Sequence, residues 1–164
     1  MAEALRARRL KRRRRQLIAG MLVGALAAGT VAFLAWRGPS LVLPSDPCAE
    51  RPPLVTRHGV RLQPLAMKAF HEAQRLAGKK IEVVQSYRSC GEQAQACLNI
   101  CGDANGCPGR CAPPGLSWHQ YGAAIDVTQA MVNSTRVVAA LERAGWCEAV
   151  PESDPGHFSY GGCH

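Results

Sequence analysis

The sequence of 164 residues has few aromatic residues and an uneven distribution of acidic ones. Phe, Trp and Tyr make up 5% of the chain, which argues against a surface that stacks on nucleic-acid bases. Residues 1–16 contain one acid but eight of the 20 Lys and Arg residues. The remaining chain holds 12 basic and 11 acidic residues, so the net charge of +8 belongs almost entirely to this arm. A basic domain that binds nucleic acid is therefore not supported.

Charged residues are absent from residues 17–36, an apolar run that directly follows the basic arm. A helix of that length spans roughly 30 Å, the thickness of the hydrocarbon core of a bilayer. Basic residues before such a span stay in the cytoplasm. We therefore expect a single-pass signal anchor in the cell membrane, with a cytoplasmic N-terminus and an extracytoplasmic C-terminal domain. A cleaved signal peptide is the alternative, since Ala25-Leu26-Ala27 resembles a cleavage site, although it lies inside the apolar run.

All eight cysteines lie in residues 48–164, which follow a proline-containing linker at 37–47 and form the predicted extracytoplasmic domain. No two cysteines have the C-x2-C spacing of zinc ribbons. An even number of cysteines in an exported domain then favours disulfide bonds. Their pairing stays open, because eight cysteines can pair in roughly a hundred ways. We expect the bridges to hold the Gly- and Pro-rich segment 102–115, which cannot form a helix or a central strand by itself.

The apolar pattern of the domain predicts helices and strands without regular β-α-β alternation. Helices are expected at 60–77, 92–99 and 134–144, and strands at 80–87, 122–128 and 156–160. The predicted fold class is therefore α+β, with a small mixed or antiparallel sheet and flanking helices, preceded by one transmembrane helix.

One carboxylate, Asp126, interrupts an apolar run that is otherwise typical of a buried strand. A buried carboxylate without a partner costs several kcal/mol, so a positive group is expected beside it. His119 precedes Gly122, where a tight turn would bring the imidazole over the strand, and His157 lies in another predicted strand. Two imidazoles and a carboxylate form a three-ligand zinc set with one position open for water. From the residues alone, structural histidines and an aspartate that binds a loop amide remain alternatives.

Three segments together are similar to a known family. Ser117–Asp126 fits S-x-H-x-x-G-x-A-x-D throughout and resembles the zinc signature of the D-alanyl-D-alanine carboxypeptidase and dipeptidase family. These are the VanY-like peptidases of the hedgehog/D,D-peptidase superfamily. In the family's order, Gln85–Ser89 resembles its S-G-Y-R-S segment, and Asp154–Phe158 resembles its C-terminal E-P-W-H-F. The similarity spans residues 85–160, but the cysteines, the basic arm and the apolar run are not part of the family pattern.

The resemblance implies a hedgehog/D,D-peptidase-like fold and one zinc ion held by His119, Asp126 and His157. It places Asp154 where the family has a catalytic Glu. There Asp154 would accept a proton from water and pass it to the leaving amine. Metal-bound water loses its proton near neutral pH and can attack a carbonyl.

Three further residues acquire substrate-binding roles from the same resemblance. Arg88 would pair with a substrate carboxylate, for which its planar and permanently charged guanidinium is well suited. Ser117 and Gln93 would hydrogen-bond the substrate near the scissile bond. Without the motif, Arg88 could equally be a surface ion-pair residue, and Ser117 could only cap the turn before His119.

Two residues depart from the family pattern. Asp154 is one methylene shorter than Glu, and Glu152 is the alternative base. Gly156 stands where the family often has Trp, so we expect one wall of the pocket to be missing.

The combined expectation is a membrane-bound zinc metallopeptidase that hydrolyses peptidoglycan stem peptides, as a D,D-carboxypeptidase or a related peptidase. Carboxypeptidase and endopeptidase activity both stay open. One alternative is a non-catalytic zinc-bearing binding domain of the same fold in the cell envelope. Another is a disulfide-stapled structural domain without metal.

Overall fold

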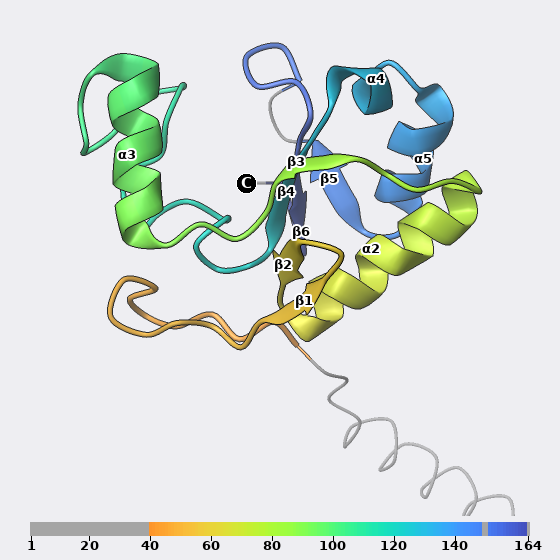
Figure 1. Ribbon diagram of the computed structural model, residues 1–164, viewed down its shortest axis with the longest axis horizontal. Helices are drawn as coiled ribbons and strands as arrows, with labels where there is room; N and C mark the ends of the chain where they lie inside the picture. Colours follow the sequence, from red (N-terminus) through yellow and green to blue (C-terminus); the bar gives the residue numbers. More distant parts are fainter. Residues whose placement is uncertain (1–39, 149–150, 164) are drawn as a thin grey trace, which may run out of the picture. The chain divides into compact units, whose positions relative to one another are not determined.

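Two small antiparallel sheets and their flanking helices make up the part of the chain that the structure describes, residues 40–148 and 151–163 (Figure 1). The structure is a computed structural model. The α+β class and the antiparallel sheet are therefore confirmed. The predicted transmembrane run 17–36 lies outside the described residues. Among the described helices, none is long and apolar enough to cross a bilayer.

The elements follow one another in an irregular order of strands and helices. They are β1 (Val55–Arg57), β2 (Val60–Leu62), α2 (Pro64–Ala77), β3 (Val83–Gln85), α3 (Cys90–Cys101), β4 (Ala124–Val127), α4 (Gln129–Val132), α5 (Thr135–Arg143), β5 (Trp146–Glu148) and β6 (His157–Tyr160). β1 and β2 form a hairpin, and the second sheet has the strand order β3-β4-β6-β5 with antiparallel neighbours throughout.

The core lies between this second sheet and the helices α2 and α5, which pack against each other. Ile125 of β4, Phe158 of β6 and Leu141 of α5 are each fully buried in it. Burial of each such side chain stabilises the fold by about 1.5–3 kcal/mol. The strands that carry Asp126 and His157 are thereby fixed from behind by apolar packing.

The prediction of a helix at 60–77 was wrong at its start, because residues 60–62 form β2. Pro64 occupies the first turn of α2, a position that proline favours because it needs no amide donor there. His58 and Gly59 both have positive φ angles and form the turn between β1 and β2. Such a turn matches the twist of an antiparallel pair and explains the hairpin. The structure also adds β5 and α4, which the apolar pattern did not indicate.

The disulfide prediction is confirmed, since all eight cysteines are paired. The bridges are Cys48–Cys90, Cys97–Cys111, Cys101–Cys107 and Cys147–Cys163. Two of them, Cys97–Cys111 and Cys101–Cys107, join α3 to the Gly- and Pro-rich segment after it. This is the segment that we expected the bridges to hold.

Residues 40–47, the described end of the predicted linker, contact the domain. The buried side chain of Gln63 accepts a hydrogen bond from the amide of Val42 (2.8 Å) and donates one to its carbonyl (2.7 Å). The same amide group also donates to the carbonyl of Tyr121 (2.7 Å). Gln63 therefore ties this segment to the turn that precedes β4.

Candidate functional site

The register of the sheet brings Asp126 and His157 together. β4 and β6 are antiparallel, and Asp126 lies directly opposite His157. The Nδ1 atom of His157 lies 2.9 Å from the Oδ1 atom of Asp126. Because both residues belong to paired strands with a buried rear face, their side chains keep a fixed separation.

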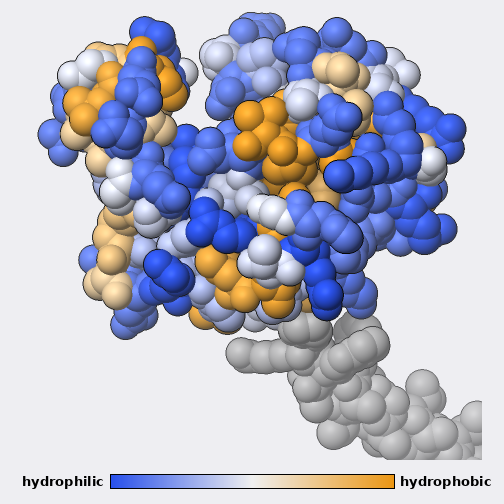
Figure 2. All heavy atoms as spheres, viewed as in Figure 1, coloured by the Kyte–Doolittle hydropathy of each residue, from blue (hydrophilic) through white to orange (hydrophobic). Residues whose placement is uncertain are grey.

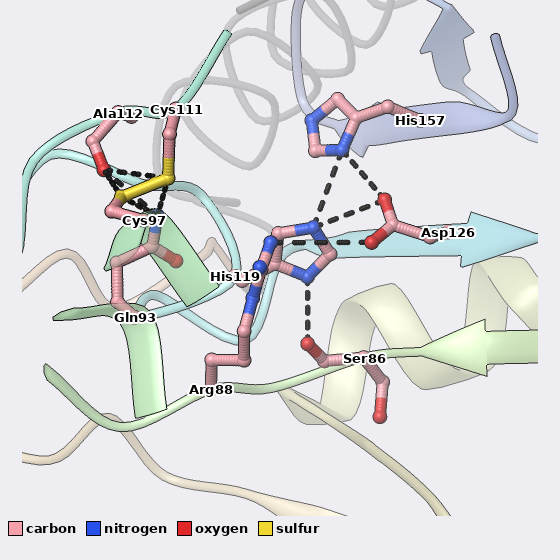
Figure 3. A network of polar contacts seen from close by, with 9 residues as sticks. All are labelled: Ser86, Arg88, Gln93, Cys97, Cys111, Ala112, His119, Asp126 and His157. Atoms are coloured by element: carbon pink, nitrogen blue, oxygen red, sulfur yellow. Dashed lines mark hydrogen bonds and ion pairs between the residues drawn. A yellow bond between two sulfur atoms is a disulfide. The ribbon is translucent and has the colours of Figure 1, made fainter. Parts of the chain in front are cut away.

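His119 enters the same place from the turn before β4. Its Nε2 atom lies 3.1 Å from Oδ1 of Asp126 and 3.2 Å from Nδ1 of His157 (Figure 3). The turn depends on Gly122, which has a φ of 63° and donates its amide to the carbonyl of His119. A Cβ atom at position 122 would lie 2.5 Å from a methyl group of Leu54. A tight turn at Gly122, as predicted, thus carries the imidazole back over the strand.

A second glutamine supports this turn from behind. Gln120 is fully buried, and its side-chain oxygen accepts hydrogen bonds from the amides of Gly115 (2.8 Å) and Ser117 (3.2 Å). Its amide nitrogen contacts the sulfur atoms of Cys48 and Cys90. Nothing in the sequence predicted this role, although Gln120 lies inside the segment that resembles the zinc signature.

The three ligand atoms fit a tetrahedral metal ion. Zinc binds nitrogen and oxygen ligands at about 2.0–2.1 Å, so neighbouring ligands in a tetrahedron lie roughly 3.3 Å apart. The three distances among His119, Asp126 and His157 are 2.9–3.2 Å. Within the described chain, these residues form a group able to hold a metal ion.

The protonation of His119 also fits a bound cation. Its Nδ1 atom donates a hydrogen bond to the carbonyl oxygen of Ser86, 2.6 Å away (Figure 3). Burial lowers the pKa of His119, so the ring is neutral and Nε2 carries a lone pair. This lone pair faces the carboxylate of Asp126, and two acceptors at hydrogen-bond distance need a cation between them. A carbonyl that orients a metal-binding histidine in this way is a common supporting contact.

Asp126 is ionised in this environment. Burial raises its pKa, but the contact with the imidazole of His157 opposes that effect, and the pKa lies well below its ordinary value. An anionic oxygen beside two ring nitrogens is the donor chemistry that zinc prefers.

Arg88 lies next to the carboxylate and is mostly buried. Its guanidinium is 3.9 Å from Oδ2 of Asp126, and its side chain is 13% exposed. Burial lowers the pKa of Arg88, opposed by the charges of Asp126 and Asp154. The Nε atom is buried and has no hydrogen-bond partner among the described residues. Arg88 is therefore a charged donor with unused hydrogen-bonding capacity beside the candidate metal centre.

One cavity of about 740 Å³ is lined by all seven residues to which the family resemblance gives a role. They are Arg88, Gln93, Ser117, His119, Asp126, Asp154 and His157. We call this cavity the cleft. Its volume is typical of sites that enclose small organic ligands.

The family model described as VanY, D-alanyl-D-alanine carboxypeptidase, matches residues 61–153, which is more than half of the chain. The chain belongs to the VanY family. No curated protein sequence matches it.

Solved structures share the fold of this VanY-family domain. VanYB in complex with D-Alanine-D-Alanine is 20% identical, with a TM-score of 0.53 over 68% of this chain and 78% of that one. A mutant of the vancomycin resistance D,D-pentapeptidase VanY from the VanB-type cassette, in complex with Zn(II), is 22% identical. Its TM-score is 0.54 over 76% of this chain and 89% of that one.

In the VanY-family domain, Gln93 is oriented by the Cys97–Cys111 disulfide and by the residue that follows it. Its amide nitrogen donates to the carbonyl of Ala112 (2.8 Å) and lies 3.5 Å from the sulfur of Cys111 (Figure 3). Its amide oxygen is buried and has no hydrogen-bond partner in the described part of the chain. Gln93 therefore supports the cleft wall through its nitrogen and has an unused acceptor.

The segment before β6 supplies the candidate base. Asp154 is exposed and lines the cleft, and its carbonyl accepts a hydrogen bond from the amide of His157 (3.3 Å). Glu152 is also exposed but is not among the residues that line the cleft. Asp154 is thus better placed than Glu152 to act near the candidate metal centre.

Gly156 is not among the residues that line the cleft, and the missing pocket wall expected there stays a prediction. It is buried with a φ of 93°, and a Cβ atom would lie 3.0 Å from both the carbonyl of Val127 and a methyl group of Val132. Its amide donates to the carboxylate of Glu148 (2.9 Å). Glycine is required here by the backbone and by the packing between β4 and α4.

Proposed function

We propose that this VanY-family chain is a zinc-dependent peptidase that hydrolyses peptidoglycan stem peptides ending in D-alanine. The observation that carries the proposal is the convergence of His119, Asp126 and His157 within 2.9–3.2 Å, with charged residues around them. The names of the two similar structures, a Zn(II) complex and a D-Alanine-D-Alanine complex, support this choice of metal and substrate.

In this proposal the three ligands hold one zinc ion, and the carbonyl of Ser86 keeps His119 in the tautomer that presents Nε2. Bound zinc would polarise the scissile carbonyl and acidify a water molecule. Asp154 accepts the proton of the attacking water and returns it to the leaving amine. Arg88 holds a carboxylate of the substrate with its unused donors, which fixes the peptide relative to the ligands.

We also propose that the domain works outside the cytoplasm, anchored by residues 17–36. The four disulfides support export, because such bonds persist in oxidising compartments. The basic arm 1–16 would remain on the cytoplasmic side.

The test compares two neighbouring carboxylates. Asp154→Asn should lower the release of D-alanine from a stem peptide by about 10²–10⁴-fold, because a general acid–base is lost. Zinc content should be unchanged, since Asp154 is not a proposed ligand. Glu152→Gln is the matched control, because this exposed side chain lies outside the lining of the cleft.

Full activity of Asp154→Asn together with loss of activity in Glu152→Gln would move the role of base to Glu152. Stoichiometric zinc without cleavage of any stem peptide by the unmodified protein would instead favour a non-catalytic zinc-bearing binding domain. Absence of bound zinc would leave a disulfide-stapled structural domain.

A further inference from the structure

The wall of the cleft away from the metal ligands is built by one disulfide-linked segment. Residues 105–113, together with Leu116, line the same cavity as the candidate ligands. We call residues 102–116 the stapled loop. In Figure 1 it lies with α3 to one side of the sheet, and Figure 3 shows Cys97–Cys111 across from His157 and Asp126.

The stapled loop is held in place by covalent and polar contacts. Cys97–Cys111 and Cys101–Cys107 attach it to α3 at two points. Cys107 and Cys111 also pair as a short antiparallel bridge. Gln93 adds a hydrogen bond to the carbonyl of Ala112. A Gly- and Pro-rich segment therefore becomes a rigid surface, and rigid binding surfaces lose little entropy when a ligand binds.

This wall exposes apolar side chains to the cleft. Leu116 is 68% exposed and Ile100, at the end of α3, is 42% exposed. Both line the cavity, as do Pro108 and Pro113. Figure 2 shows hydrophobic residues at the surface of the lobe that contains α3. Exposed apolar residues beside a polar catalytic centre are typical of a ligand-binding surface.

The charged side chain on this wall is basic. Arg110 is the charged side chain that the stapled loop contributes to the cavity lining. The loop's carboxylate, Asp103, is exposed and is not part of that lining. The guanidinium of Arg110 donates to the carbonyl of Ile100 (3.1 Å), which holds it beside the exposed apolar residues. Because an arginine has five N–H donors, this contact leaves several free for a ligand.

We propose that the stapled loop binds the part of the peptide substrate on the amino side of the scissile bond. Arg110 pairs with a carboxylate in that part of the peptide, and Leu116 and Ile100 contact its apolar portions. This inference rests on the proposed function, because it assigns the metal-proximal half of the cleft to the C-terminal D-alanine residues. It makes the enzyme selective for stem peptides that carry a free acidic group before the D-alanines.

The experiment uses two peptides of equal length that end in D-Ala-D-Ala and differ only in the preceding residue, Glu or Gln. The zinc-loaded full chain should cleave the Glu peptide with a kcat/KM about fivefold higher, as expected for a partly exposed ion pair. Arg110→Gln should remove this preference by raising KM for the Glu peptide, and Arg110→Lys should keep most of it. Arg57→Gln, an exposed arginine outside the cleft, should leave the preference unchanged.

A further variant separates apolar contact from charge. Leu116→Ser should raise KM for both peptides and leave their ratio unchanged. Equal cleavage of the two peptides by the unmodified protein would overturn the inference, as would an equal effect of Arg110→Gln on both. A calorimetric measurement of peptide binding distinguishes failure of this inference from failure of the proposed function. Tighter binding of the Glu peptide that depends on Arg110, without any cleavage, would support the binding surface and refute the peptidase assignment.

Discussion

The turn that carries His119 gives a sharp prediction for Gly122→Ala. Gly122 has a φ of 63°, a conformation that costs an L-residue about 1–2 kcal/mol. The added methyl group would lie 2.5 Å from Leu54 and 3.2 Å from the amide nitrogen of Gln63. Overpacking of this kind costs about 1–3 kcal/mol. The free energy of unfolding should therefore fall by about 2–5 kcal/mol when both costs are combined.

Gly59→Ala is the matched control. Gly59 has a φ of 83°, but nothing lies within 4 Å of the position of its Cβ atom. This variant should lose only the backbone component, about 1–2 kcal/mol. Urea unfolding of the chelator-treated proteins measures both values, and zinc titration should show weaker binding only in Gly122→Ala. Equal losses of stability in the two variants, with equal zinc affinity, would refute the steric argument and the proposed role of the turn.

Two further predictions concern pH and the disulfides. Because burial lowers the pKa of His119 below its ordinary 6.5, the unfolded chain takes up a proton that the folded chain does not. The free energy of unfolding of the zinc-free protein should therefore be highest above pH 6.5 and fall below that pH by at most about 1.4 kcal/mol per pH unit. Urea titrations should show a smaller decrease in His119→Gln. An equal decrease in this variant would contradict the assignment to His119. Two double variants test the disulfides: Ser in place of Cys97 and Cys111, and Ser in place of Cys147 and Cys163. The two bridges close loops of similar length (sequence separations 14 and 16). Each double variant should therefore lower the free energy of unfolding by about 3 kcal/mol. Only the first pair should also reduce peptide cleavage, since that bridge supports the cleft wall, and an equal reduction in both would argue against this role.

The local part of the site was readable from the sequence. His119, Gly122 and Asp126 lie within one turn and the strand after it, so their spacing alone predicts that they meet. His157 is 31 residues beyond Asp126, and its position depends on the register of β4 and β6. The residues alone made it one of three possible zinc ligands, with a structural histidine as the alternative, and the resemblance to the VanY-like family strengthened that prediction.

Two elements have local signals in the sequence that indicate where they begin. Ser89 and Glu92 form a capping box, so α3 begins at Cys90, earlier than the predicted residue 92. The turn at His58 and Gly59 likewise indicated a hairpin before Pro64.

Other features depend on tertiary structure and had no local signal. The disulfide pairing follows from which segments lie beside α3, and loop spacing alone does not determine it. Gln63 is a buried polar residue because backbone groups of the distant residues Val42 and Tyr121 satisfy its side chain. Gly156 has a positive φ and packs closely against β4 and α4, which its place in the sequence did not reveal.

The most direct test measures D-alanine release from a peptide ending in D-Ala-D-Ala while zinc is added back to chelator-treated full-length protein. Activity should rise from zero and level off at one zinc ion per chain. The Ala variants of His119, Asp126 and His157 should stay inactive at the same zinc concentration. Activity that persists without metal, or in any of these three variants, would contradict the account of a single zinc centre.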